Sequence, residues 1–190
     1  MTGAAPALRP PDLLLTPRLR LRPPVMDDAP RIFDTYAQDA EVTRYLLWAP
    51  HAHAEETREF LRRCRDVREA GTAFTWALTW RQGPEAGRLL GMVELRADGH
   101  RPDLGYVLAR PYWGAGLMTE AVRAVVEWAL AQPAVHRVWA VCDRENVASA
   151  RVLEKAGLAR EGLLRRWLVH PGMGATPRDC WCYAAVKENG

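Results

Sequence analysis

Two glycines separated by a single residue stand at the start of a helical run. They are Gly114 and Gly116, in the stretch "WGAGLMTEA" over residues 113–121. The first N–H groups of a helix have no partner within the helix, and glycine has no Cβ that would hold a ligand away. Such a turn can bind the oxygens of a phosphate group. From the residues alone, close packing of the helix explains the two glycines as well as phosphate binding does.

The hydrophobic pattern places this turn between a strand and a helix. The predicted strands cover residues 18–22, 73–80, 88–99, 101–110, 136–146, 161–170 and 179–186. The predicted helices cover residues 27–46, 55–71, 117–131 and 147–157. Three consecutive strands form an antiparallel meander before the glycines. We therefore expect an α/β (α+β) fold.

A dinucleotide-binding turn of the form G-x-G-x-x-G is an alternative, because a strand and a helix frame the glycines and Asp143 ends the next strand. The third glycine of that pattern is replaced by Thr119. The strands before the turn also pair in an antiparallel way, whereas the dinucleotide fold has a parallel sheet. Both observations disfavour this alternative.

The composition indicates one globular domain. The chain has 190 residues, of which 48% are hydrophobic, and this suits a single core. We expect a flexible tail over residues 1–12 and one domain over residues 13–190. No uncharged run is longer than residues 70–80, well short of the roughly 20 apolar residues of a membrane helix. We predict neither a membrane span nor a signal peptide, and therefore a cytoplasmic protein.

The net charge and the spacing of the cysteines limit the kinds of ligand that the chain is expected to bind. The net charge of +3 suggests mild affinity for anions, such as a phosphorylated cofactor, and we expect no direct binding of nucleic acid. Cys64 and Cys142 stand alone, and Cys180 and Cys182 have no second cysteine pair with which to form a metal site. The histidines of "HAH", residues 51–53, are interpreted as loop residues. We predict no metal.

Three stretches, in this order, resemble the GNAT superfamily of acetyl-CoA-dependent N-acetyltransferases: "LLTPRLRLRP", "DLGYVLARPYWGAGLMTEAV" and "NVASARVLEKAGL". More narrowly, they are similar to the branch that acetylates the N-termini of ribosomal proteins. The resemblance covers about Leu13 to Val186. It implies a mixed, mostly antiparallel central sheet with helices on both faces, acetyl-CoA as the cosubstrate and an amine as the acceptor.

The resemblance also implies a coenzyme site at the glycine turn. Its pyrophosphate-binding residues would be Trp113, Gly114, Ala115, Gly116, Leu117, Met118 and Thr119. Pro111 replaces the family's usual glutamine or arginine, which removes a side-chain contact and one N–H. A bulge near Val107 and Leu108 would turn a backbone N–H toward the acetyl carbonyl, although an ordinary core strand fits the residues equally well. Asn146, also a good N-cap, would contact the coenzyme arm, and Lys155 would reach a phosphate.

The reaction requires a neutral amine and favours protonation of the departing thiolate. Many members of the family use a tyrosine seven residues after the asparagine, and that position is Leu153 here. Ser149 lies one helical turn earlier and matches the serine of the ribosomal-protein branch, so we predict that Ser149 is the hydrogen-bond donor. Asp103 and Glu94 are the candidates for the base, either directly or through a water molecule.

The acceptor is less well determined by the sequence. An α-amine suits a weak base because more of it is neutral at pH 7 than of a lysine. The same branch includes enzymes for polyamines, antibiotics and free amino acids, so the acceptor is a protein N-terminus, such as that of a ribosomal protein, or a small-molecule amine. The loop over residues 170–179 could border a groove for it. We expect a monomer or a homodimer. A coenzyme-A-binding module without catalysis is the alternative function, because the tyrosine is missing.

Overall fold

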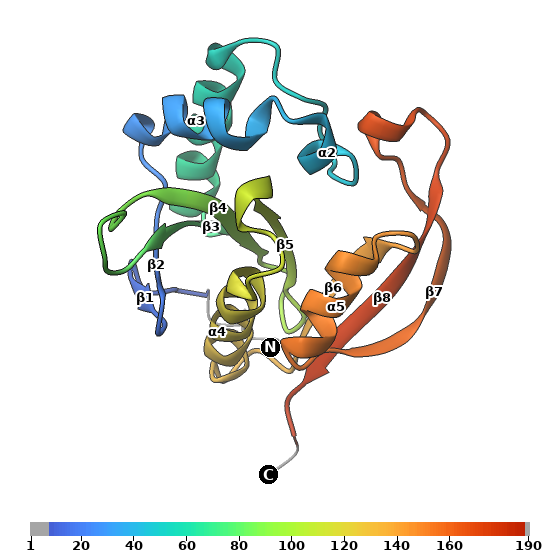
Figure 1. Cartoon of the computed structure of the whole chain (residues 1–190). Helices are drawn as coiled ribbons and strands as arrows, with labels where there is room; N and C mark the ends of the chain where they lie inside the picture. Colours follow the sequence, from blue (N-terminus) through green and yellow to red (C-terminus); the bar gives the residue numbers. More distant parts are fainter. Residues whose placement is uncertain (1–7, 189–190) are drawn as a thin grey trace.

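A single mixed sheet runs through the protein, whose computed structural model describes residues 8–188 (Figure 1). Its eight strands lie in the order β1-β2-β3-β4-β5-β6-β8-β7. The strands are β1 (Leu14–Leu15), β2 (Leu19–Arg22), β3 (Ala73–Trp80), β4 (Leu89–Arg96), β5 (Asp103–Leu108), β6 (Arg137–Asp143), β7 (Ala159–Leu168) and β8 (Arg178–Val186). All neighbouring pairs are antiparallel except β5 and β6. The expected mixed, mostly antiparallel fold is confirmed.

Three longer helices accompany the sheet: α3 (Ala54–Glu69), α4 (Leu117–Leu130) and α5 (Val147–Lys155). The helix predicted over residues 27–46 is wrong as a single element. It is divided into a 3-10 turn (Met26–Asp28), α1 (Ala29–Ile32), a π-helical turn (Phe33–Ala37) and α2 (Ala40–Thr43). The break has a local cause, because Asp39 caps α2 by accepting a hydrogen bond from the N–H of Glu41.

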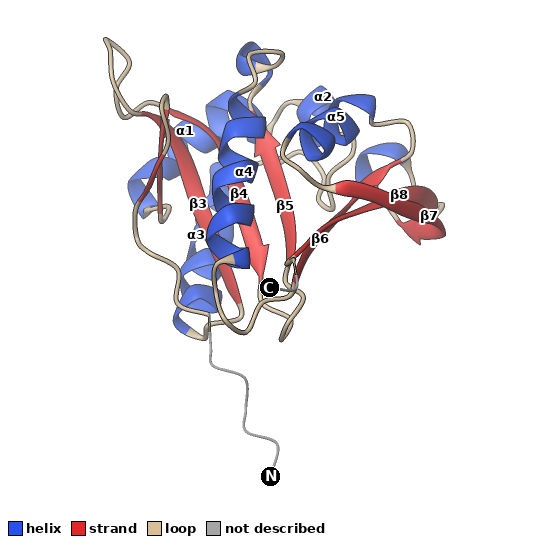
Figure 2. Ribbon diagram, turned by 90° about the horizontal axis from the view of Figure 1, so that it is seen from below, coloured by secondary structure: helices blue, strands red, loops and turns tan. Residues whose placement is uncertain are grey.

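Helices cover both faces of the sheet (Figure 2). Alternate residues of β3 explain this arrangement, since successive side chains of a strand point to opposite faces. Trp76 and Leu78 belong to a core that includes the apolar face of α4. Ala77 belongs to a second core with residues of α1 and α3. The predicted packing of the helix after the glycines against the sheet is therefore observed.

Part of the expected N-terminal tail packs on this domain. Leu8 is buried in the core shared with α4, and the indole N–H of Trp76 donates to the carbonyl of Pro11. Residues 1–7 of that expected tail lie outside the described residues.

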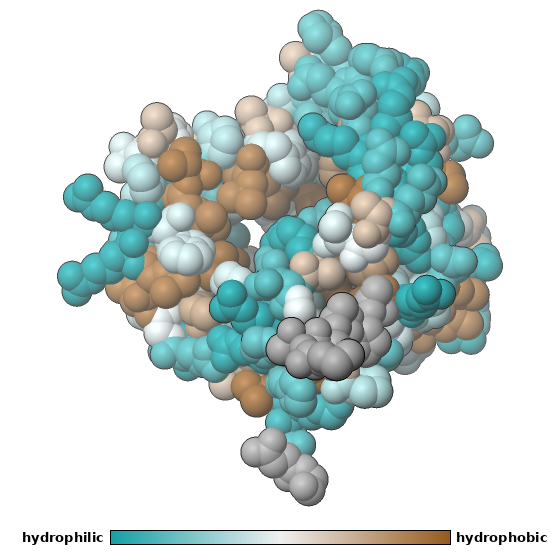
Figure 3. Space-filling model, turned by 180° about the vertical axis from the view of Figure 1, so that it is seen from behind, coloured by the Kyte–Doolittle hydropathy of each residue, from teal (hydrophilic) through white to brown (hydrophobic). Residues whose placement is uncertain are grey.

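The sheet opens between β5 and β6. These parallel strands are paired only at Asp103 and Trp139, near the amino end of β5. Beyond this point they diverge, so that the sheet has one arm with β1–β5 and another with β6–β8 (Figure 2). From behind, a hollow separates the two arms, and apolar surface gathers on the β6–β8 arm (Figure 3). Main-chain groups of β5 are therefore left without a neighbouring strand.

Candidate active site

The glycine turn presents a row of unused backbone donors at the start of α4. Gly114 and Gly116 have φ values of 75° and 73°, a left-handed conformation that favours glycine. None of the N–H groups of residues 114–119 donates a hydrogen bond to another residue within 8–188. This arrangement is suited to the oxygens of a pyrophosphate.

Tight packing does not account for the two glycines. A Cβ added to Gly114 would meet no atom within 4 Å, and one added to Gly116 would lie 3.7 Å from a guanidinium nitrogen of Arg18. The space above the turn is open. The alternative left by the sequence, in which the glycines allow close helix packing, is therefore not supported.

A carboxylate in the first turn of α4 fixes the β1–β2 loop beside the glycines. Glu120 accepts hydrogen bonds from the N–H and Nε of Arg18, at 2.8 and 2.7 Å, and from the hydroxyl of Thr16. Burial acts to raise the pKa of Glu120, but these hydrogen bonds outweigh it and lower that pKa. Arg18 also donates to the carbonyl of Ala115 at 2.8 Å. It thus places a guanidinium next to the turn, which the sequence pattern did not indicate.

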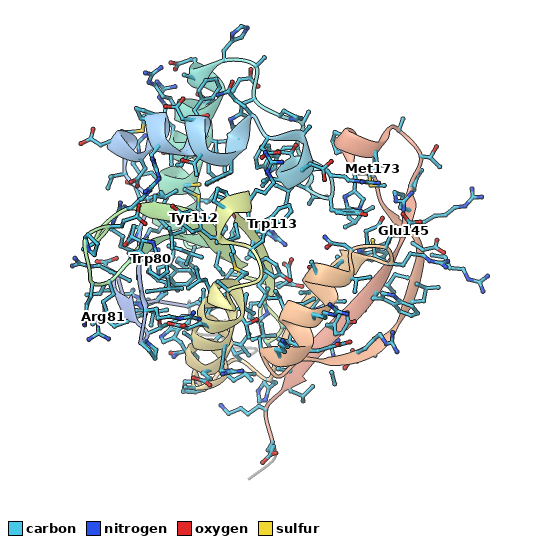
Figure 4. The ribbon with its side chains drawn as sticks, viewed as in Figure 1. Trp80, Arg81, Tyr112, Trp113, Glu145 and Met173 are labelled. Carbon is cyan, nitrogen blue, oxygen red and sulfur yellow. The ribbon has the colours of Figure 1, made fainter. Side chains whose placement is uncertain are left out.

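Aromatic side chains fix the segment between β5 and the glycines. The indole N–H of Trp113 donates to the carbonyl of Leu108 at 2.7 Å, and the ring of Tyr112 packs edge-to-face on that of Trp80, with centroids 6.3 Å apart (Figure 4). Pro111 lies between these anchors in a 3-10 turn. Pro111, which stands where the family usually has glutamine or arginine, is thus part of a turn that the contacts of Tyr112 and Trp113 hold in place.

The expected bulge in β5 is absent from the ladder with β4. The register runs without a shift from Asp103 to Leu108. The N–H of Ala109 donates to the carbonyl of Leu90. Because main-chain groups alternate between the two edges of a strand, the N–H of Leu108 faces the opening and that of Val107 faces β4. An exposed N–H arises here because β6 diverges.

Tyr106 and Ser149 meet across the opening. The phenol oxygen of Tyr106 is 2.7 Å from Ser149 Oγ and also donates to the Ser149 carbonyl at 3.1 Å. Asn146 caps α5 by accepting a hydrogen bond from the N–H of Ser149 at 3.1 Å. Burial raises the pKa of Tyr106, so its hydroxyl keeps its proton. Leu153, at the family's tyrosine position, is completely buried in the core.

Both predicted base candidates are bound to one guanidinium. Arg96 donates to Glu94 Oε1 and to Asp103 Oδ2, each at 2.9 Å. Glu94 also accepts a hydrogen bond from the hydroxyl of Thr75. Asp103 lies at the closed end of the opening, where β5 and β6 are paired. The structure brings the two carboxylates together, and the role of either as a base stays a prediction.

Lys155, the last residue of α5, has a carbonyl that accepts a hydrogen bond from Arg123 of α4. This contact joins the end of α5 to the middle of α4. The phosphate contact expected of the Lys155 ammonium stays a prediction, as does the contact of Asn146 with the coenzyme arm.

The sequence missed a buried cluster at the end of β6. Asp143 accepts a hydrogen bond from Arg178 Nε at 2.6 Å and another from the N–H of Glu145 at 2.9 Å. His170 Nε2 lies 3.5 Å from Asp143 Oδ2. Burial alone would raise the pKa of Asp143, but the hydrogen bond from Arg178 and its charge lower it. Because Asp143 is buried and paired, it is not placed to bind a ribose, and the dinucleotide alternative is not supported.

The described residues contain neither a metal-binding cluster nor a membrane-spanning helix. Over residues 8–188, no three His, Cys, Asp or Glu side chains gather where they could hold a metal ion. No helix in this part of the chain is long and apolar enough to span a membrane.

Comparison with known proteins connects this geometry to an activity. A family profile described as "Acetyltransferase (GNAT) domain" matches residues 18–159. The chain is 29% identical over 175 residues to the uncharacterized N-acetyltransferase YoaA of Bacillus subtilis, covering 92% of this chain and 97% of that protein. It is 27% identical over 170 residues to the [ribosomal protein uS5]-alanine N-acetyltransferase of Escherichia coli, covering 84% of each.

A solved structure extends the comparison to the fold. It is described as RimL, the ribosomal L7/L12 alpha-N-protein acetyltransferase, in complex with coenzyme A. It superposes with a TM-score of 0.79 at 19% identity, over 91% of this chain and 96% of that one. At this identity the likeness shows the shared fold.

Proposed function

We propose that this chain, which belongs to the GNAT acetyltransferase family, transfers the acetyl group of acetyl-CoA to the α-amine of a protein or peptide N-terminus. The observation that carries the proposal is the opening between β5 and β6. It has the free N–H of Leu108 on one edge and the Tyr106–Ser149 pair beside it. The bound coenzyme supplies an activated acetyl thioester there.

The residues on the coenzyme side each have a physical role in this proposal. The free N–H groups of residues 114–119 bind the pyrophosphate, and the N–H of Leu108 donates to the acetyl oxygen as negative charge develops on it. The Tyr106 hydroxyl, linked to Ser149, donates a proton to the departing thiolate. The hydroxyl that Leu153 lacks is thus provided from β5 instead of α5.

The acceptor is proposed to enter from the opposite face, under a strap formed by residues 169–177 between β7 and β8. Gly172 of the strap packs on the backbone of Thr43 and Arg44 after α2, and the ring of His170 meets that of Tyr45 edge-to-face. The strap therefore spans from one arm of the sheet to the helices of the other. A flexible chain end fits a passage of this kind better than a helix or a folded surface does.

Two further considerations favour an α-amine. At pH 7 about one α-amine in ten is neutral, against roughly one lysine in a few thousand. The compared proteins from E. coli and of the RimL structure are described as acting on the alanine of uS5 and on L7/L12. A ribosomal protein with a small N-terminal residue is accordingly the acceptor we propose.

An amine panel tests the proposal. Acetyl-CoA is incubated with peptides that begin with alanine or serine, with the same peptides blocked at the α-amine but carrying lysine, and with spermidine. Release of free thiol gives the rate, and tandem mass spectrometry locates the acetyl group. We expect acetylation of the free α-amines. Turnover confined to lysine or spermidine would overturn the proposed acceptor, and coenzyme binding without thiol release would support a binding module.

A further inference from the structure

His170 is a buried histidine whose imidazole makes no hydrogen bond within the described part of the chain. Only 2% of its side chain is exposed, and neither ring nitrogen has a hydrogen-bond partner among the described residues. A buried polar group without a partner destabilises the fold, so its retention calls for an explanation. Asp143 is the nearest group of opposite charge, with Oδ2 3.5 Å from Nε2.

The position of Asp143 along β6 brings this pair to the level of the free N–H groups of β5. The two parallel strands are paired at Asp103 and Trp139. Asp143 follows Trp139 by as many residues as Val107 follows Asp103. Parallel strands advance at the same rate, so Asp143 lies at the level of the end of β5, on the far side of the opening between the two strands.

The pair also lies on the face of the sheet away from the proposed thiolate donor. Cys142 belongs to the core that includes the apolar face of α4. Asp143 is the next residue of β6, so its side chain points to the other face. There His170 meets Tyr45. The amine would thus lose its proton on one face of the sheet, and the thiolate would receive a proton on the other.

A polar cavity lies next to residues that contact the pair. It has a volume of about 260 Å³ and is bordered by Met173 and Arg178. The N–H of Met173 donates to the His170 carbonyl, and Arg178 binds Asp143. The cavity is large enough for water or for the end of a peptide. His170 does not line it and both of its ring nitrogens are buried, so the acceptor reaches the imidazole only if the 169–177 strap shifts.

We infer that His170, oriented by Asp143, is the base that removes the proton from the acceptor amine. The inference rests on the proposed function only in requiring an amine acceptor. Nε2–H of the imidazole faces Asp143, which leaves Nδ1 as the proton acceptor, directly or through one water molecule. The inference requires the separation of 3.5 Å to shorten when the acceptor binds, as is common for catalytic hydrogen bonds in unliganded enzymes.

The proton balance is complete with groups already present. An ammonium acceptor gives one proton to Nδ1 of His170, and the neutral nitrogen then forms a bond to the acetyl carbon. The bond between that carbon and sulfur breaks, and the thiolate takes a proton from the Tyr106–Ser149 pair. The new amide nitrogen loses a second proton to solvent, and solvent returns one proton to the hydroxyl pair. His170 then releases its proton to solvent, so each turnover releases one proton in net.

The test compares two acceptors that differ in basicity. Each peptide is prepared with an ordinary α-amine and with an aminooxyacetyl N-terminus, which is already neutral at pH 7. For the ordinary amine, we expect His170→Gln to lower kcat about 100-fold at neutral pH, the lower end of the usual contribution of a general base. The loss should shrink at high pH and be much smaller for the aminooxy acceptor. Coenzyme affinity should not change.

The charged and polar groups around His170 define the controls. They are Asp143 from β6, Arg178 from β8, and Arg44 and Tyr45 after α2. Asp143→Asn should show the same dependence on acceptor basicity, with a smaller loss. His136→Gln changes an exposed histidine before β6 and should have no effect. An equal loss for both acceptors at every pH would assign His170 a structural role and overturn the inference.

A second readout does not depend on turnover or on the stability of a variant. The wild-type protein, labelled with 15N at its histidines, is saturated with coenzyme A and titrated with the acceptor peptide. The imidazole resonances of His170 should shift on addition of the peptide, and an unchanged spectrum would contradict the inference. If the amine panel selects another amine, the same comparison is made with that amine and its aminooxy analogue, so the two proposals fail separately.

Discussion

The phenol oxygen of Tyr106 lies 2.7 Å from Ser149 Oγ, and this contact joins β5 to α5 across the opening of the sheet. Two hydroxyl groups are thereby placed at a point where the family resemblance predicts one. Either oxygen can be the donor in this contact.

The first prediction concerns this pair as a unit. Tyr106→Phe should lower kcat by ~100- to 1,000-fold, the usual effect of removing an aligned donor from a developing charge. Ser149→Ala should have an effect of the same order, and the double variant should be no slower than the slower single variant, since the groups act together. Thiol release at saturating acetyl-CoA measures all three rates. If the loss of kcat in the double variant equalled the product of the two single losses, the hydroxyls would act independently.

The second prediction concerns the glycine turn and has a matched control. Gly116→Ala and Gly83→Ala both place a side chain at a left-handed position, with φ values of 73° and 88°. Each should reduce the free energy of unfolding by about 1–2 kcal/mol. Only Gly116→Ala should weaken coenzyme A binding, because Gly83 lies in the β3–β4 turn. Calorimetric titration measures the affinity for coenzyme A. Equal affinities for both variants would contradict the binding of the pyrophosphate by the glycine turn.

The third prediction separates structure from catalysis at Asp103. Asp103→Asn removes a charged partner of Arg96, and we expect a loss of about 1 kcal/mol in the free energy of unfolding, small because Arg96 is partly exposed. The pH dependence of kcat should keep its shape. Urea unfolding and a pH–rate profile test the two parts. Loss of rate mainly at acidic pH would instead assign the base to Asp103.

The fourth prediction follows from the lowered pKa of Asp143. A carboxyl whose pKa is lower in the folded than in the unfolded chain stabilises the fold above its unfolded pKa of about 3.9 and loses this effect as the pH falls through the folded value. Arg178→Gln removes the main cause of the lowering. Its stability should therefore begin to fall at a higher pH than that of the wild type. Thermal unfolding between pH 3 and pH 7 would show parallel curves if Arg178 had no such effect.

The parts of the site that are local in sequence could be predicted from it. The glycine turn, the helix after it and the capping role of Asn146 depend on a few adjacent residues, and the structure places them as expected. The strand pattern likewise predicted the antiparallel meander of β3, β4 and β5, whereas the complete mixed sheet was implied by the family resemblance. Each of these features follows from backbone preferences that act over a few residues.

The parts formed by tertiary contacts could not be predicted. Tyr106 and Ser149 are far apart in the sequence, and no local pattern indicates that the phenol reaches α5. The same holds for Asp143 and His170, which meet only because β8 inserts between β6 and β7. Asp143 at the end of an apolar strand was the one signal available in the sequence, and we interpreted it there only as an element of a dinucleotide fold.

The divergence of β5 from β6 has a consequence for the order of events. With coenzyme bound at the α4–α5 face and the acceptor approaching from the α1–α3 face, neither substrate blocks the entry of the other. On the proposed routes, both would occupy the enzyme together, and the acetyl group would pass between them without a covalent acetyl-enzyme stage. We therefore expect double-reciprocal plots at several fixed acceptor concentrations to form intersecting lines, the signature of a ternary complex, in contrast to the parallel lines of a ping-pong enzyme.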